Sequence, residues 1–393
     1  MPRPLPALRL TGATILRDNA LQTRSISVAE GRIARGPWPE IDLCGYYVLP
    51  GIIDLHGDAF ERHIAPRPSA PFPLATGLRA TDRDAAANGV TTAWLAQSWS
   101  WEGGHRSPDF ARAVMLALDH YRPHALTDLR LQIRCETHTV ETANELLASL
   151  AAHDIDYVVF NNHLDEMLSA AATRPGEFAL WARRAGRSPE AHMAQLRAAR
   201  RQAREVPRYL CRLAEAFDRM GITYGSHDDP DGETRETFSM IGAKICEFPM
   251  SRTAAALARA VGDPVLMGAP NVVRGGSQAG NIAALDLIGD GLCTALVSDY
   301  YYPALAQAAF RLVDDRVLDL PAAWAMISST PAEILRLPDR GHLAPGSRAD
   351  LVVINKATRA IEATIAGGRI THLAGEAAQR FFDALHAPAI AAE

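Results

Sequence analysis

Histidines and carboxylates follow five apolar runs of the sequence, and each run is typical of a buried β-strand. The residues are His56, Asp58, Glu136, His163, His227 and Asp299. Imidazole and carboxylate groups without cysteine are ligands that proteins use for Zn²⁺, Mn²⁺ and similar divalent ions. A single histidine in such a place is usually a packed or surface residue. Six such groups at strand ends together indicate a divalent metal centre.

The first of these runs, LPGIIDLHGD (49–58), ends on two candidate ligands. Its apolar residues predict a short buried strand that begins after the Pro-Gly break. His56 and Asp58 stand two positions apart, so a strand places both side chains on the same side, with Asp54 in phase.

Eight apolar runs alternate with stretches of helical spacing, and this alternation predicts how the candidate ligands are positioned. The runs are 52–56, 90–96, 131–136, 157–163, 222–228, 243–248, 264–269 and 294–299. Eight β-then-α units predict a (β/α)₈ barrel, whose active site lies at the carboxyl ends of the strands. An open doubly wound sheet is the alternative, but no G-x-G-x-x-G follows the first run.

The intervening stretches predict the barrel helices, at 80–88, 109–119, 142–153, 206–220, 251–261 and 279–287. Residues 179–204 are rich in Ala and Arg at helical spacing. We expect a helical excursion over the barrel mouth there, and an exposed helix without a role is the alternative.

Both ends of the chain show the short alternating runs of β-strands. Residues 1–49 contain too few strands to bury a core alone, and residues 341–393 repeat the pattern. We therefore expect the two ends to pair in one small β domain beside a barrel at 50–340.

The composition is ordinary for a globular protein, with 48% hydrophobic and 22% charged residues and a net charge of −5. It gives no reason to expect nucleic acid or a membrane as a partner. The five cysteines form no C-x-x-C, and Cys135 and Cys246 lie inside predicted strands, where packing explains them. With no apolar run of about 18 residues, we expect a soluble, cytoplasmic protein.

Six potential ligands exceed the four of a tetrahedral zinc site and suit two divalent ions with a bridging carboxylate. Glu136 is the best candidate for the bridge. A carbamylated lysine is the alternative, and Lys244 is the one lysine within the predicted barrel.

Several further residues are candidates for binding phosphate. In NVVRGGSQAGN (271–281), Arg274 offers a guanidinium, while Gly275 and Gly276 allow backbone N–H groups to approach an anion. A plain connector is the alternative. Arg62, His63 and Arg67 follow the first ligand pair on a loop that prolines could simply stiffen. Asp228 either orients a ligand or caps the next helix.

Several motifs resemble the amidohydrolase superfamily and, within it, the diphosphatases of the carbon–phosphorus lyase pathway. They are LPGIIDLHGD, ERH-x-x-PRP, RCETH, the histidine at 163, GSHDD, EFP, MGAPNVVRGGS-x-x-GN and SDYYP. The resemblance implies a distorted (β/α)₈ barrel with a β-sandwich from both termini. It also implies two divalent ions, Zn or Mn, and cleavage of a ribose 1-alkylphosphonate 5-triphosphate to the 5-phosphate and pyrophosphate.

The resemblance also implies roles for the candidate ligands. His56 and Asp58 take the place of the first-strand pair, and Glu136 takes the bridging position. His163 and His227 hold the second ion. Asp299 binds the first ion and handles the proton of the attacking water.

The sequence departs from the family at Leu164–Met167, at Gln278 and in HGDAF, where other residues are common. The first two are expected to contact the non-reacting end of a small phosphorylated substrate, so the group on the ribose stays open. An amidohydrolase acting on a C–N bond and a non-catalytic pathway subunit are the alternatives. A homodimer is compatible with the sequence.

Overall fold

The computed structural model describes residues 4–67 and 70–386, and its centre is an eight-stranded parallel barrel. In spatial order the strands are β8 (Ile52–Gly57), β9 (Val90–Trp99), β10 (Asp128–Glu136), β11 (Tyr157–Asn161), β12 (Thr223–His227), β13 (Ile245–Glu247), β14 (Val265–Gly268) and β15 (Ala295–Val297). Each strand coincides with one predicted run, which confirms the barrel.

The barrel closes between its first and last strands through an irregular contact. Gly57 and Asp299 form an isolated parallel bridge, in which the N–H of Asp299 donates to His56 (3.0 Å) and the N–H of Asp58 donates to Asp299 (2.8 Å). The buried Asp54 carboxylate accepts hydrogen bonds from the N–H (2.8 Å) and Oγ (2.6 Å) of Ser298. Asp54 therefore fastens the last strand to the first.

Gly57 has no room for a side chain at this closure, since a Cβ would lie 2.8 Å from Asp54 Oδ2 and 2.9 Å from Ser298 Oγ. We expect Gly57→Ala to lower the free energy of unfolding by about 1–3 kcal/mol, because the methyl group must displace the closing pair. Chemical denaturation measures the change. The control is Gly289→Ala, where a Cβ meets nothing within 4 Å. Equal stability of the two variants would contradict this account of the closure.

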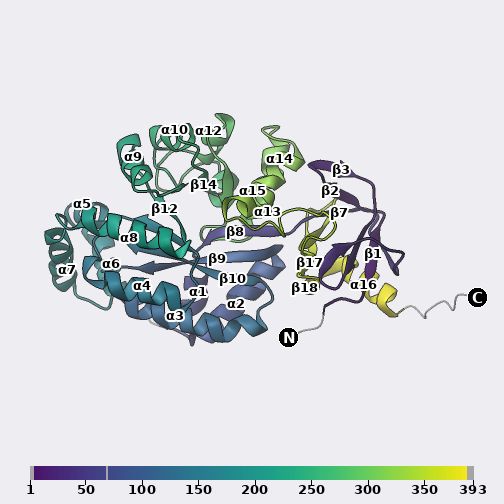
Figure 1. Ribbon diagram of the computed structural model, residues 1–393, viewed down its shortest axis with the longest axis horizontal. Coiled ribbons are helices and arrows are strands. Elements are labelled where there is room, and N and C mark those ends of the chain that lie inside the picture. The colour runs from purple at the N-terminus through teal and green to yellow at the C-terminus, as the bar shows by residue number, and fades with distance from the viewer. Residues whose placement is uncertain (1–3, 68–69, 387–393) are drawn as a thin grey trace, which may run out of the picture.

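Helices cover the outside of the barrel, as Figure 1 shows. They include α2 (Leu74–Ala87), α3 (Pro108–Tyr121), α4 (Ala143–Ala152), α8 (Val206–Met220), α9 (Gly232–Met240), α10 (Arg252–Ala260), α12 (Ala284–Gly289), α13 (Ala304–Asp314), α14 (Leu320–Ala325) and α15 (Ser329–Ile334). In α8 the buried side chains recur three or four positions apart, which presents one apolar face to the barrel. Helix α12 begins later than the sequence predicted.

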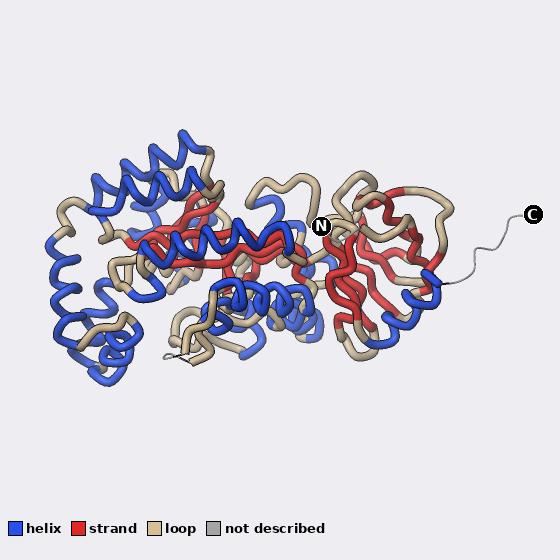
Figure 2. Tube along the Cα trace, turned by 90° about the horizontal axis from the view of Figure 1, so that it is seen from below, coloured by secondary structure: helices blue, strands red, loops and turns tan. Residues whose placement is uncertain are grey.

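Three helices form a separate unit at the end of the barrel opposite the β-sandwich (Figures 1 and 2). They are α5 (Leu164–Thr173), α6 (Pro175–Arg184) and α7 (Pro189–Arg201). Leu164, Phe178 and Leu196 pack with Trp101 in a small core of their own. The predicted excursion is therefore helical, and it begins at Leu164, earlier than expected.

The two ends of the chain build one β-sandwich, which confirms the prediction. Its sheets have the order β5-β4-β1-β6 and β18-β17-β16-β7-β2-β3. The strands are β1 (Leu8–Thr11), β2 (Thr14–Arg17), β3 (Ala20–Gln22), β4 (Ile26–Ala29), β5 (Arg32–Ala34), β6 (Glu40–Asp42), β7 (Tyr46–Pro50), β16 (Leu351–Asn355), β17 (Ile361–Ala366) and β18 (Arg369–Leu373). Pairing of β7 with β16, with Leu351 opposite Pro50, joins the ends, and α16 (Gly375–His386) follows. Residues 1–3 and 387–393 lie outside the described residues.

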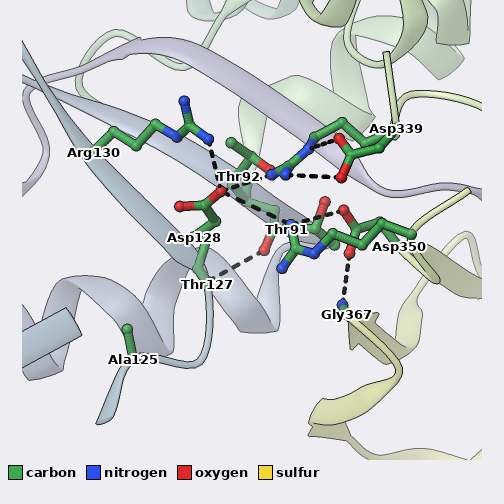
Figure 3. Close-up of polar contacts among 12 residues, drawn as sticks. Thr91, Thr92, Ala125, Thr127, Asp128, Arg130, Asp339, Asp350 and Gly367 are labelled. Carbon is green, nitrogen blue, oxygen red and sulfur yellow. Dashed lines mark hydrogen bonds and ion pairs between the residues drawn. The ribbon is translucent and has the colours of Figure 1, made fainter. Parts of the chain in front are cut away.

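A polar network fastens the base of the barrel to the segment that returns to the sandwich (Figure 3). Asp128, the first residue of β10, accepts hydrogen bonds from Arg340 Nη1 (2.7 Å) and Arg130 Nη2 (3.2 Å). Arg340 also donates to Thr92 (3.0 Å) and to Asp339 (2.9 Å). The network joins the amino-terminal end of β10 to the segment that precedes β16. Within 4–67 and 70–386, no helix is long and apolar enough to cross a membrane.

Asp128 makes the stability of this network depend on pH. Burial acts to raise the pKa of Asp128, but Arg130 and Arg340 outweigh it and hold the pKa below its usual value. A lowered pKa stabilises the fold above the unfolded-state pKa of about 4, and this contribution is lost as the pH falls through the folded-state pKa.

We therefore expect Asp128→Asn to lower the free energy of unfolding at pH 7 by about 1–3 kcal/mol, since Arg340 stays buried with a weaker partner. The difference from wild type should shrink toward about pH 3. Urea denaturation at a series of pH values measures it, with Asp109→Asn, at an exposed pair with Arg112, as control. A loss that does not change with pH would contradict the role of the charge.

Candidate active site

The carboxyl ends of the barrel strands open into a cavity of about 1180 Å³. Five of the six predicted ligands line it, while Glu136 is buried and pairs with His163. The predicted residues on its wall are His56, Asp58, His163, His227, Asp228, Arg274, Gly276, Gln278 and Asp299. The structure thus brings most of the predicted site together at one rim.

A first group of three metal-capable side chains consists of His56, His227 and Glu247, all buried. Their ligand atoms lie within 4.8 Å of one another, and His56 Nδ1 is 2.8 Å from Glu247 Oε2. Gln132 Nε2 (2.6 Å) and the Tyr157 hydroxyl (2.5 Å) both donate to Glu247 Oε1, which fixes the carboxylate. The sequence did not identify Glu247 as a ligand, although it lies next to the end of the sixth predicted run and ends the observed strand β13 at the same rim as the other candidates.

Left-handed backbone conformations follow three of the strands that carry this site. Asp228, Phe248 and Asp299 have φ of 60°, 49° and 55°. A non-glycine residue held in this region costs about 1–3 kcal/mol, and such residues concentrate at functional sites. The turn at Phe248 places its ring against the imidazoles of His56 and His227. The ring centroids lie 5.0 Å and 4.9 Å apart, so Phe248 restricts the positions of both imidazoles.

A second group consists of Glu102, Glu136 and His163. His163 Nδ1 lies 2.5 Å from Glu136 Oε1 and 3.3 Å from Glu102 Oε1. Asn161 Nδ2 donates to Glu136 (3.3 Å), and Arg106 Nη1 donates to both Glu102 oxygens (3.1 and 2.9 Å). Sequence analysis missed Glu102 because it lies in a loop three residues beyond β9.

Burial and neighbouring charges shift the pKa values of residues in both groups and of Asp299 beside them. Burial lowers the pKa of His227 to about 4, against the opposing effect of Asp228. Burial also acts to lower the pKa of His163, but Glu136 and Glu102 outweigh it and raise the pKa to about 9. Burial and the neighbouring Asp58 raise the pKa of Asp299 to about 7. Crowded acids beside imidazoles favour the binding of a cation.

The first group also fits a divalent metal because one of its ring nitrogens has no hydrogen-bond partner of good geometry. The buried Nδ1 of His227 makes no hydrogen bond of good geometry, although Asp228 Oδ2 lies 2.8 Å away. Buried polar atoms normally have a partner, and a divalent ion would supply one here. Two imidazoles and a carboxylate form a ligand set that zinc and manganese accept. Asp58 and Asp299 belong to neither three-residue group but line the same cavity.

Comparison with known proteins places this geometry in a family. Residues 276–373 match the amidohydrolase family. The chain is 31% identical over 369 residues to the alpha-D-ribose 1-methylphosphonate 5-triphosphate diphosphatase of Escherichia coli K12, covering 88% of this chain and 95% of that protein. The chain belongs to the amidohydrolase family. It is therefore a hydrolase, as the sequence predicted.

Solved structures share the fold of this amidohydrolase at low sequence identity. The 5-methylcytosine deaminase of Klebsiella pneumoniae has a TM-score of 0.63 at 13% identity, over 93% of this chain and 98% of that chain. The N-acetylglucosamine-6-phosphate deacetylase of Pasteurella multocida has a TM-score of 0.62 at 12% identity, over 93% and 99%. These likenesses confirm the barrel with its terminal sandwich.

Two interpretations from the sequence are settled by burial. Lys244 is exposed and precedes β13, at the end of the strand away from the rim, so it is not placed to act as a carbamylated bridge at the candidate site. Cys135 and Cys246 are buried in the apolar core, which confirms their packing role.

The glycine loop differs from the expected anion cradle. Gly275, with φ of 82°, ends helix α11 (Ala269–Arg274), and its N–H donates to the carbonyls of Asn271 and Val272. The N–H of Gly276 also donates to Asn271 (3.0 Å). Both N–H groups are thus used to cap the helix, and the expectation that they receive a phosphate is corrected. Arg274 instead reaches Gln278 (3.2 Å) and Tyr300 (3.4 Å) at the cavity wall.

The remaining predicted residues lie in two places. Arg62 and His63, on α1 (Phe60–Ile64), face Asp84 at 3.8 and 3.4 Å, and Arg67 is exposed on the following loop. None of the three lines the cavity. Asp228 does line it beside His227, and Asp231 caps α9 by accepting from the N–H of Thr234, so the capping alternative for Asp228 is wrong.

If Glu247 is a metal ligand, we expect Glu247→Gln to lose most of its bound metal after dialysis, because a neutral amide replaces the carboxylate and binds divalent ions less tightly. Inductively coupled plasma mass spectrometry of Zn and Mn per chain measures the loss. The control Glu236→Gln changes an exposed carboxylate on α9 and should keep the wild-type metal content. Equal metal content in both variants would remove Glu247 from the ligand set.

Proposed function

We propose that this amidohydrolase is a metal-dependent diphosphatase. Its substrate would be a ribose 1-alkylphosphonate 5-triphosphate, cleaved to the 5-phosphate and pyrophosphate. The observation that carries the proposal is the identity of 31% along 88% of the chain to a protein named for this reaction. The cavity supports it, because metal-capable groups and Arg274 line the same wall, and phosphoanhydride cleavage needs both cations and a nucleophilic water.

The metal ligands are part of the proposal. His56, His227 and Glu247 would hold one divalent ion, and Glu102, Glu136 and His163 mark the place for a second, with Zn and Mn as the candidates. When bound, such ions lower the pKa of water and neutralise phosphoryl oxygens. Asp58 and Asp299 stand at the cavity wall near the first group and complete the predicted set of six.

Asp299 is the proposed catalytic residue. Its carboxylate lines the cavity beside His56, to whose carbonyl its own N–H is bonded. Attack of water on the phosphorus forms one P–O bond and breaks the P–O bond to pyrophosphate. Asp299 takes the proton that the water loses and returns it to the departing pyrophosphate, so the atoms and charges balance.

Arg274 and Gln278 are the proposed contacts for the non-reacting end of the substrate. Both are exposed at the cavity wall, where Arg274 also approaches the Tyr300 hydroxyl. A guanidinium with free donors suits a phosphonate or phosphate group. The helix cap at Gly275 and Gly276 would hold Arg274 at this position.

We expect Asp299→Asn to lower kcat for pyrophosphate release by about 10²–10⁴-fold, the usual contribution of a general acid–base group. Asparagine tolerates the left-handed backbone, so the fold should persist. The control Asp18→Asn replaces an exposed aspartate whose φ is 53° in the sandwich and should keep full activity.

A coupled pyrophosphate assay with added Mn²⁺ or Zn²⁺ measures the rates. Dipeptides, cyclic amides and N-acyl sugars serve as competing substrates in the same preparation. Hydrolysis of one of these C–N bonds, with no pyrophosphate from the ribosyl triphosphate by metal-loaded protein, would contradict the proposed function. Unaltered activity of Asp299→Asn would overturn the role of that carboxylate alone.

A further inference from the structure

We propose that Arg134 is the residue that binds the oxyanion of the phosphoryl group held at the base of the cavity. This inference rests on the proposed function, because it assigns the place where the reacting phosphate lies. Arg134 stands two positions before Glu136 on β10, so both side chains point to the same face of the strand. It lines the cavity, yet only 8% of it is exposed.

The guanidinium of Arg134 forms no ion pair with a carboxylate of the described chain. Its one hydrogen bond runs from Nη2 to Asn161 Oδ1 at 3.5 Å, and its buried Nε has no partner. Over 4–67 and 70–386, no carboxylate oxygen lies within 4.0 Å of it. Glu61, Asp228 and Asp299 interact with this charge from a longer distance. Buried donors without a partner are costly, so an anion that binds from the cavity can use the donors that Arg134 leaves free.

The other buried arginines of the described chain show how a structural arginine differs. Arg235 is fully buried and donates to Asp263 (2.6 Å), to Ser226 (2.6 Å) and to the Ile245 carbonyl (3.2 Å). Arg340 is buried and donates to Asp128 and Asp339. Both have carboxylate partners inside the protein, and neither lines the cavity, which leaves Arg134 free to bind a ligand.

The surroundings place Arg134 at the reacting centre. It lines the same cavity as His56, His227 and the proposed catalytic Asp299. The planar guanidinium group can donate parallel hydrogen bonds to two phosphoryl oxygens at once, which a lysine cannot do.

The alternative is a positioning role through Asn161, which contacts both Glu136 and His163. The two roles predict different results for Arg134→Met. Loss of an anion-binding residue leaves the ligand-free fold about as stable as wild type, since the fold loses no ion pair and only one hydrogen bond of 3.5 Å. Loss of a positioning residue lowers the stability and the metal content.

The experiment titrates inorganic phosphate into metal-loaded protein by calorimetry, with metal content per chain measured for every variant. We expect wild type to bind phosphate and Arg134→Met to raise the Kd by about 10- to 100-fold, the loss typical of a charge-assisted hydrogen bond. Arg134→Lys should recover part of the affinity, because it restores the positive charge without the paired N–H donors of the guanidinium group. The control Arg219→Met, at an exposed arginine on α8, should match wild type.

Thermal unfolding gives a second readout that does not depend on activity. Phosphate should raise the Tm of wild type and of the control variant, and should leave the Tm of Arg134→Met nearly unchanged. An unchanged phosphate Kd in Arg134→Met, or no phosphate binding by wild type, would overturn the inference. So would a lower ligand-free Tm and lower metal content in both Arg134→Met and Arg134→Lys.

The outcomes separate this inference from the proposed function. Phosphate binding that depends on Arg134, without release of pyrophosphate from the ribosyl triphosphate, would overturn the proposed function and support the anion site. Pyrophosphate release with a phosphate affinity that does not depend on Arg134 would overturn the anion site alone.

Discussion

The contact between the first and the last strand of the barrel is the constraint on which the site depends. Asp54 holds Ser298 with two hydrogen bonds, and the backbone of Asp299 pairs with that of His56. This closure brings a histidine near the start of the chain beside an aspartate far along it. Because a rigid frame fixes the distance between their backbones, the side chains need little further ordering to act together.

Charge is balanced at the barrel rim by pairs of side chains from different strands. His56 on β8 pairs with Glu247 on β13, and His163 pairs with Glu136 from the neighbouring strand. Burial makes each isolated charge costly, so these pairs neutralise one another when no cation is bound. A divalent ion can replace the proton that each pair shares, which links metal binding to deprotonation. Arg134 is the exception, because its one hydrogen bond goes to the neutral Asn161 and not to a carboxylate.

The sequence predicts the strands and the rim residues well, because apolar runs report burial and a barrel brings all strand ends to one rim. Glu247 was within reach of that reasoning, since it lies next to the last residue of the run 243–248, and in the structure it ends β13. Glu102 was not within reach, because its place depends on the loop after β9. The N–H groups of Gly275 and Gly276 illustrate a second limit: composition indicates a flexible turn, but only the fold shows that the turn caps α11.

The central claim is that the barrel rim holds a divalent ion on His56, His227 and Glu247. Anomalous X-ray scattering at the zinc or manganese edge, from crystals of metal-loaded protein, tests it most directly. The account predicts an anomalous peak within bonding distance of all three side chains, with the contact between His56 and Glu247 opened by the ion. A peak elsewhere, or an intact hydrogen bond between His56 and Glu247 in metal-loaded crystals, would contradict it.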